Sequence, residues 1–248
     1  MIVIRNLIYW LLLCLITPPM FLLFIPAALF PKGANKMGQL WALALMWMLK
    51  HIIGLNYRVI GRENIPAGPA IICSKHQSGW ETLALQEIFP LHVYVAKREL
   101  FKLPFFGWGL KLTKAIGIDR SNSTQANKQL MEQGLARKND GLWITIFPEG
   151  TRIAPGEKGR YRLGGARMAK MFEMNMVPVA LNSGEFWPRN SFMKYPGEVT
   201  VVIGQPLKYD SGTQEELMAQ CETWIENQQK QISGIGPCAA GKAQAKGV

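Results

Sequence analysis

The 248-residue sequence predicts an α/β fold, in which a mixed, largely parallel central sheet is flanked by helices and preceded by an N-terminal membrane-associated helical hairpin. Two observations predict this fold. The N-terminal part is almost uninterruptedly apolar, and the rest alternates short β-branched runs with helical stretches. We therefore divide the chain into a membrane-associated helical segment (1–56), an α/β domain (57–233) and a flexible tail rich in Gly, Ala and Lys (234–248).

The first apolar stretch, Leu7–Phe30, contains no charged residue. As one helix it would rise about 36 Å, more than the roughly 30 Å hydrocarbon core of a bilayer. Because Pro18-Pro19 and Pro26 would each kink or end a helix, two short helices dipping into one leaflet are an alternative to one crossing. A cleaved signal peptide is disfavoured, since the run is long for such a segment.

The second apolar stretch, Met37–Leu49, is too short to span a bilayer but suits an interfacial or buried helix. Together the two stretches predict a helical hairpin seated in the membrane. Five side chains near their ends are of the types that anchor at lipid headgroups: Trp10, Trp41, Trp47, Lys50 and Arg58.

Charge indicates the class of binding partner, and cysteine spacing bears on disulfides and metal sites. Lys and Arg outnumber Asp and Glu by 28 to 17, so an anionic partner is expected. The basic residues are scattered and no nucleic-acid-binding motif occurs, so we exclude nucleic acid and expect membrane lipid. Positive charges flank the first apolar stretch on both sides, which leaves its orientation open. The four cysteines form no CxxC pair, so neither a disulfide framework nor a metal site is expected.

Beyond the hairpin, apolar β-branched runs predict strands buried on both faces, as in a parallel sheet. Helical stretches lie between them, at Ser123–Lys138 and Gly165–Glu173, and Thr213 with Glu216 forms a capping-box pattern that starts the last helix. The predicted strands are Tyr57–Gly61, Ala70–Ser74, His92–Ala96, Ala115–Ile118, Trp143–Phe147, Val177–Leu181 and Val199–Ile203.

His76 and Glu81 are the candidate catalytic pair. His76 follows a predicted strand, at the end where open α/β sheets place their ligands. On a regular helix two side chains five residues apart point about 140° apart, so we expect His76 in the turn and Glu81 in the first helical turn. The carboxylate can then reach back, fix the imidazole tautomer and leave the other nitrogen as a base. Taken alone, a histidine at a strand end is more often structural.

The pair resembles the His-x4-Asp box of the glycerolipid acyltransferases, the 1-acylglycerol-3-phosphate acyltransferase family. The resemblance covers about residues 57–203, and Glu stands at position 81 where the family usually has Asp. The longer side chain moves the carboxylate by about one bond length. Three further blocks follow in the family's order: Gly117-Ile118-Asp119-Arg120, Phe147-Pro148-Glu149-Gly150-Thr151-Arg152 and Val177-Pro178-Val179-Ala180-Leu181.

The second and third motifs supply candidate phosphate ligands. Gly150 lets the backbone approach a ligand closely, and Arg152 offers a fork that matches phosphate oxygens. The resemblance implies that Glu149, Gly150, Thr151 and Arg152 bind the acceptor's glycerol phosphate and that Arg120 is a second phosphate ligand. A further basic cluster lies among aromatic residues and suits donor or membrane contacts: Lys97, Arg98 and Lys102.

The resemblance implies transfer of a fatty acyl group to the free hydroxyl of 1-acyl-sn-glycerol 3-phosphate, giving phosphatidate. The acyl thioester donor, acyl-CoA or acyl-acyl carrier protein, is a co-substrate, and no other cofactor is expected. We expect the cytoplasmic (inner) membrane, with the active site facing the cytosol. Two alternatives stay open: another lyso-lipid acceptor, such as a lyso-ornithine lipid or a lysophospholipid, or a catalytically silent membrane-binding homologue.

Overall fold

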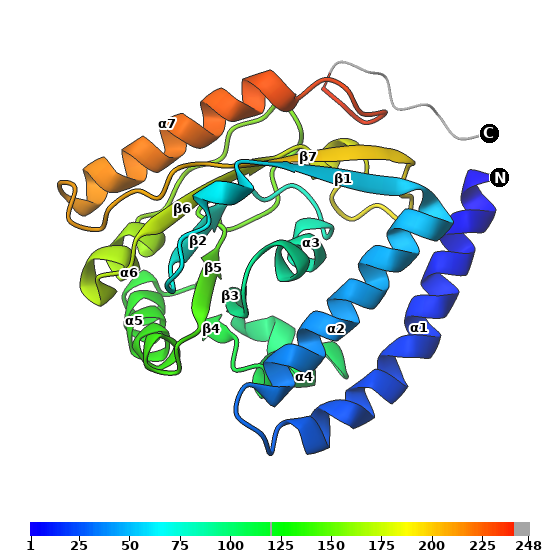
Figure 1. The fold of residues 1–248 in the computed structure, drawn as a ribbon, viewed down its shortest axis with the longest axis horizontal. Helices are drawn as coiled ribbons and strands as arrows, with labels where there is room; N and C mark the ends of the chain where they lie inside the picture. The colour runs from blue at the N-terminus through cyan, green and yellow to red at the C-terminus, as the bar shows by residue number, and fades with distance from the viewer. Residues whose placement is uncertain (120, 241–248) are drawn as a thin grey trace.

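The computed structural model describes residues 1–119 and 121–240, and it confirms an α/β fold built on a sheet of seven strands (Figure 1). Every predicted strand is present, within two residues of its predicted bounds. The strands are β1 (Leu55–Ile60), β2 (Ile71–Ser74), β3 (His92–Lys97), β4 (Ile116–Ile118), β5 (Trp143–Ile146), β6 (Met176–Leu181) and β7 (Gly197–Ile203). Their order is β1-β7-β6-β2-β5-β3-β4, and neighbours run parallel except β6 and β7, which makes the sheet mixed.

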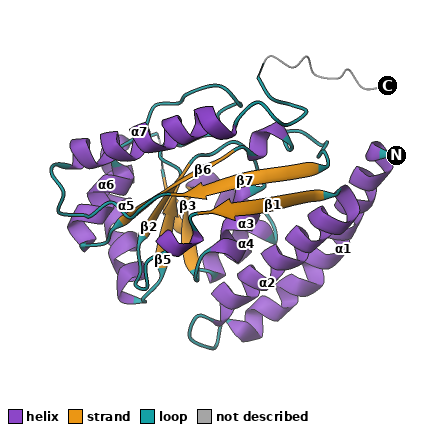
Figure 2. Ribbon diagram, turned by 45° about the horizontal axis from the view of Figure 1, so that its top comes forward, coloured by secondary structure: helices purple, strands orange, loops and turns teal. Residues whose placement is uncertain are grey.

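Helices cover both faces of this sheet, so the strands are buried on two sides (Figure 2). Alternate residues of β2 belong to different cores: Ile72 packs with the N-terminal helices, and Ile71 with the C-terminal ones. The helices are α1 (Ile2–Ala27), α2 (Gly33–Met48), α3 (Glu81–Ile88), α4 (Phe106–Leu112), α5 (Ser123–Asn139), α6 (Gly164–Phe172) and α7 (Gln214–Ile232). The expected capping box of Thr213 and Glu216 starts α7.

The N-terminal helices α1 and α2 form the predicted hairpin and lie side by side in both ribbon views (Figures 1 and 2). The alternative of two short helices is wrong, because Pro18, Pro19 and Pro26 all lie inside the continuous α1. Packing against α2 supports the helix there, and the Trp41 indole N–H donates to Thr17 Oγ1 one residue before the first proline. Trp41 is therefore half-buried between α1 and α2, and its expected place at the lipid headgroups stays a prediction.

One side of α1 exposes large apolar residues at helical spacing, including Leu7, Leu11, Leu15 and Leu22. By length and composition α1 is able to cross a bilayer. This apolar helix is consistent with association of the protein with a membrane.

The C-terminal segment beyond α7 lies against a short 3₁₀ turn, η4 (Ser183–Glu185), which follows β6. The buried Glu185 carboxylate accepts hydrogen bonds from the backbone N–H groups of Gly234 (2.6 Å), Ile235 (3.1 Å) and Gly236 (2.8 Å). The start of the expected tail is thus fixed to the domain, and its last part, 241–248, lies outside the described residues.

Asn6 ties α1 to the loop between η4 and β7. Its fully buried side chain donates to Lys194 O (3.0 Å) and accepts from Lys194 N (2.8 Å). The Lys194 ammonium lies over the rings of Tyr9, Trp10 and Trp187 at 3.9–4.5 Å from their centroids. The membrane helix and the α/β domain are therefore joined by buried polar contacts as well as by apolar packing.

We predict that Asn6→Ala destabilises the protein, because it leaves both backbone groups of Lys194 without their buried partner. The expected loss is about 2 kcal/mol, or about 4–8 °C in the midpoint of thermal unfolding in detergent. Leu7→Ala is the matched control, since Leu7 is the exposed neighbour on the same helix. Equal midpoints for the two variants would contradict this role of Asn6.

Candidate active site

Two parallel strands bring the predicted site residues together. β2 and β5 are adjacent and parallel, so their carboxyl ends lie at the same edge of the sheet. The turn after β2 carries His76, and the loop after β5 carries Phe147–Arg152. A backbone hydrogen bond from Ile153 N to His76 O (2.8 Å) joins the two segments. His76 and Arg152 line the same cavity, as a shared substrate requires.

His76 and Glu81 adopt the geometry expected from the sequence. Glu81 is the first residue of α3, and its Oε1 lies 2.8 Å from His76 Nδ1. The imidazole stacks on Phe147 with ring centroids 3.9 Å apart, which fixes its plane. Since Nδ1 is bound to the carboxylate, Nε2 is the nitrogen that remains for a proton from a substrate.

Glu81 is fully buried, and protein donors saturate its carboxylate. Oε1 also accepts from the N–H groups of Gln77 and Ser78, each at 2.7 Å, and Oε2 accepts from Ser183 Oγ at 2.6 Å. Burial alone would raise the pKa of Glu81, but the hydrogen bonds from His76, Ser183 and Ser78 outweigh it, so this pKa lies below its ordinary value. The carboxylate is therefore charged and fixed beside the imidazole.

A second set of buried charges, formed by Lys75 with Glu149 and Glu226, adjoins His76 in the sequence. Lys75, only 1% exposed, donates from Nζ to Glu149 Oε1 (2.7 Å) and to Glu226 Oε1 (2.9 Å). The other Glu149 oxygen accepts from His76 N (3.3 Å), and Gly159 N (3.1 Å) also donates to Oε1. The Glu149 carboxylate is thus engaged by the protein and holds the backbone of His76, while its expected role in binding the acceptor stays a prediction.

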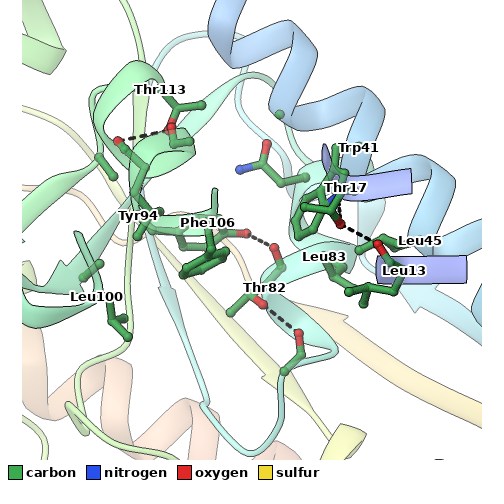
Figure 3. Close-up of a pocket in the computed structure, with 18 of the residues that line it drawn as sticks. Leu13, Thr17, Trp41, Leu45, Thr82, Leu83, Tyr94, Leu100, Phe106 and Thr113 are labelled. Atoms are coloured by element: carbon green, nitrogen blue, oxygen red, sulfur yellow. Dashed lines mark hydrogen bonds between the residues drawn. The ribbon is translucent and has the colours of Figure 1, made fainter. Parts of the chain in front are cut away.

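The cavity has a volume of about 860 Å³ and is lined mainly by apolar and aromatic side chains (Figure 3). Helices α1 and α2 form one wall, and β3, α3 and α4 form the others. Hydrogen bonds among the wall residues hold it in shape, such as Tyr94 O–H to Thr82 O (3.1 Å) and Thr113 O–H to Gly109 O (2.9 Å), both drawn in Figure 3. The N-terminal hairpin therefore also encloses the space beside His76.

A second histidine, His92, also lines this cavity but lacks a carboxylate partner. Its Nδ1 lies 3.0 Å from Pro90 O, so Nδ1 carries a proton, and its Nε2 is buried without a hydrogen-bond partner. Burial lowers the pKa of His92 to about 4. The structure thus distinguishes His76, which has the orienting carboxylate, from His92.

The loop after β5 presents three of the expected phosphate ligands to the cavity: Gly150, Thr151 and Arg152. Gly150 has φ 69°, a conformation that favours glycine. Arg152 Nε is buried and has no hydrogen-bond partner among residues 1–119 and 121–240, and the half-buried guanidinium side chain brings a positive charge to the cavity. Arg189, from the loop after η4, lines the same cavity and donates to Arg152 O (3.1 Å). No motif in the sequence pointed to Arg189.

Of the other basic candidates that the structure describes, one lines the cavity and two do not. Lys97, at the end of β3, lines the cavity, whereas Arg98 and Lys102 do not. Arg120 lies outside the described residues. The preceding Asp119 accepts hydrogen bonds from both the N–H and the O–H of Ser121.

Besides Arg189, three further polar residues near His76 were not predicted from the sequence. Ser183 and Glu226 are far from His76 in sequence, and no local pattern connects them to it. Lys75 carried a signal, because a lysine directly after a buried apolar strand requires a buried partner. No group of three or more His, Cys, Asp or Glu side chains able to hold a metal occurs within 1–119 and 121–240.

Comparisons with known proteins show the family to which the chain belongs. A family model described as Acyltransferase matches residues 56–182. The 1-acyl-sn-glycerol-3-phosphate acyltransferase of Pseudomonas aeruginosa is 42% identical over 200 residues, which are 79% of this chain and 78% of that protein. The protein of the same name from Saccharomyces cerevisiae is 32% identical over 143 residues, 55% of this chain and 46% of that protein.

A solved structure shares the fold. The crystal structure of the 1-acyl-sn-glycerophosphate (LPA) acyltransferase PlsC from Thermotoga maritima matches with a TM-score of 0.77 and 20% identity, over 94% of this chain and 98% of that one. The buried His76–Glu81 pair, the order of the motifs and these likenesses lead to one assignment. The chain belongs to the 1-acyl-sn-glycerol-3-phosphate acyltransferase family.

Proposed function

We propose that this protein transfers a fatty acyl group from acyl-CoA or acyl-acyl carrier protein to the free hydroxyl of 1-acyl-sn-glycerol 3-phosphate, giving phosphatidate. The observation that carries the proposal is that His76, paired with buried Glu81, and Arg152, with its unpartnered Nε, line one largely apolar cavity. The relatives are named 1-acyl-sn-glycerol-3-phosphate acyltransferases, and this supports 1-acyl-sn-glycerol 3-phosphate as the acceptor.

In this mechanism His76 Nε2 accepts the proton of the acceptor hydroxyl as that oxygen attacks the thioester carbonyl carbon. The tetrahedral intermediate collapses by breaking the carbon–sulfur bond, and the imidazolium returns the proton to the departing thiolate. Glu81 keeps the imidazole in one tautomer and stabilises the imidazolium, so the nucleophile comes from the substrate and no acyl-enzyme is needed.

The acceptor phosphate binds at the loop after β5, where Arg152 pairs with its oxygens and Thr151 donates a hydroxyl hydrogen bond. Gly150 allows the phosphate to approach the backbone. We assign Arg120 to the same phosphate on the resemblance of its motif alone. Lys97 stands at the cavity wall and suits a donor phosphate, while Arg98 and Lys102 suit lipid headgroups outside it.

We assign the acyl chain to the part of the cavity between α1, α2 and α4, whose lining includes Phe21, Phe24 and Leu110. Its volume of about 860 Å³ lies within the range of small-molecule sites. We assign residues 1–56 to membrane attachment, 57–233 to catalysis and 234–248 to a tail. The active site faces the cytosol of the cytoplasmic membrane, since the thioester donors are made there.

Two alternatives are weighed against this function. An acceptor without a phosphate, such as a lyso-ornithine lipid, would leave the Arg152 guanidinium without a ligand. This argument favours a phosphate-bearing acceptor and leaves a lysophospholipid as the remaining alternative to lysophosphatidate. A catalytically silent homologue would have no need of the charged, fully hydrogen-bonded Glu81 against His76, which favours an enzyme.

We predict that His76→Ala lowers acyl transfer by about 10²- to 10⁴-fold, because it removes the base. The measurement is thiol release from the acyl thioester by purified protein with lysophosphatidate present. His51→Ala is the matched control, since His51 is exposed at the end of the hairpin. Near-normal turnover in the His76 variant would exclude His76 as the base.

We predict that Arg152→Ala lowers kcat/KM for lysophosphatidate by about 10- to 100-fold, the effect of losing a hydrogen bond between charged groups. An acceptor with the same acyl chain but no phosphate should be affected far less, so the preference for phosphate should shrink. Arg160→Ala is the control, because Arg160 is exposed and outside the cavity. Equal losses with both acceptors would argue against phosphate binding by Arg152.

We predict that Gly38→Leu shifts the donor preference towards shorter acyl chains. A Cβ at Gly38 would already lie 3.2 Å from Thr113 Cγ2 and 3.7 Å from Phe24 Cζ, at the cavity wall between α1, α2 and α4. Competition between long and short acyl thioesters measures the shift. Gly68→Leu, in an open loop with nothing near its Cβ position, should leave the preference unchanged.

A further inference from the structure

The second oxygen of the Glu81 carboxylate has a donor of its own, and this donor comes from a distant part of the chain. Ser183, fully buried in η4 after β6, donates from Oγ to Glu81 Oε2 at 2.6 Å. The other three hydrogen bonds to this carboxylate, from His76, Gln77 and Ser78, all end on Oε1. Ser183 therefore holds the one oxygen that the catalytic turn itself leaves without a donor.

The length of the Glu81 side chain makes this contact necessary. Glutamate has one more rotatable bond than aspartate, so donors on one oxygen alone leave the carboxylate plane free to rotate about that oxygen. A donor on Oε2 removes this freedom and aims Oε1 at His76 Nδ1. Because aspartate is one methylene shorter, we expect that an aspartate at position 81 would lose the 2.6 Å contact with the Ser183 hydroxyl.

The turn that carries Ser183 is itself held on both sides. Gly184 N donates to Gln77 Oε1 (3.1 Å), which ties η4 to the catalytic turn. The Glu185 carboxylate accepts from backbone N–H groups of the segment after α7, Gly234 (2.6 Å) and Gly236 (2.8 Å) among them. The Ser183 hydroxyl is thus presented from a fixed support, which a positioning contact requires.

We propose that Ser183 is a positioning residue of the acyl transfer, which orients Glu81 and through it the catalytic base His76. Ser183 does not touch substrate; its effect passes through the carboxylate. The inference rests on the proposed roles of His76 and Glu81, and it assigns to this chain a three-residue unit of His76, Glu81 and Ser183, in which Glu at position 81 and Ser at position 183 function together.

The test is a double-mutant cycle between positions 81 and 183. Ser183→Ala is expected to lower kcat by about 10- to 100-fold with KM for lysophosphatidate within about threefold, because the base is misaligned while the binding residues are untouched. In the Glu81→Asp background, where the contact is already lost, Ser183→Ala should lower kcat by less than about threefold. Ser211→Ala, in an exposed turn, controls for loss of a hydroxyl elsewhere.

Equal losses in the two backgrounds, or a loss confined to KM, would overturn the proposal, because a merely structural serine would behave in that way. The midpoint of thermal unfolding is measured for each variant. If Ser183→Ala prevents folding, Ser183→Cys takes its place, because a thiol fills the position but is a weak donor. Ser183→Cys must then also lower kcat more with Glu81 than in the Glu81→Asp background. A His76→Ala variant that retains turnover would instead refute the proposed function, whereas an inactive His76→Ala with a fully active Ser183→Ala refutes only the role of Ser183.

Discussion

Burial of one carboxylate constrains the whole site. Glu81 is fully buried, and an ionised group without water must be hydrogen-bonded on both oxygens to stay charged. Two of its donors are backbone groups of the turn between β2 and α3, one is the imidazole, and one is Ser183 from beyond β6. The turn conformation, the helix start and the β6 connection are thus fixed together, and the orientation of His76 follows from them.

A second buried carboxylate, that of Glu149, holds the two neighbouring residues Lys75 and His76. Lys75 and His76 are adjacent in sequence, yet Lys75 pairs with Glu149 and Glu226 while His76 pairs with Glu81. Because Glu149 Oε2 also accepts from His76 N, the backbone of the histidine and its ring are each held by a different carboxylate. Glu149 therefore joins the loop that carries Arg152 to the turn that carries His76.

The sequence was sufficient where the signal is local. Continuous apolar runs predicted each strand, and the adjacency of a strand end, a histidine and a carboxylate predicted the His76–Glu81 contact. The sequence was insufficient where tertiary packing decides the local structure, or where contacting residues are far apart in the chain. The prolines of α1 favoured a break, but contact with α2 keeps the helix continuous. Ser183 and Glu226 reach the site through the sheet order, in which β2 lies between β5 and β6, and no spacing in the sequence reports that order.

The same sheet order explains why the membrane helix and the reaction centre are close. α1 and α2 pack on the face of the sheet that also carries α3, so their inner sides form a wall of the cavity beside His76, while the outer side of α1 exposes leucines. Asn6 and Lys194 fix α1 to the loop that supplies Arg189 at the cavity mouth. Under the proposed function, a substrate with an apolar tail and a phosphate head would then need no route through water, because the helix expected to meet lipid also forms a wall of the cavity proposed for the acyl chain.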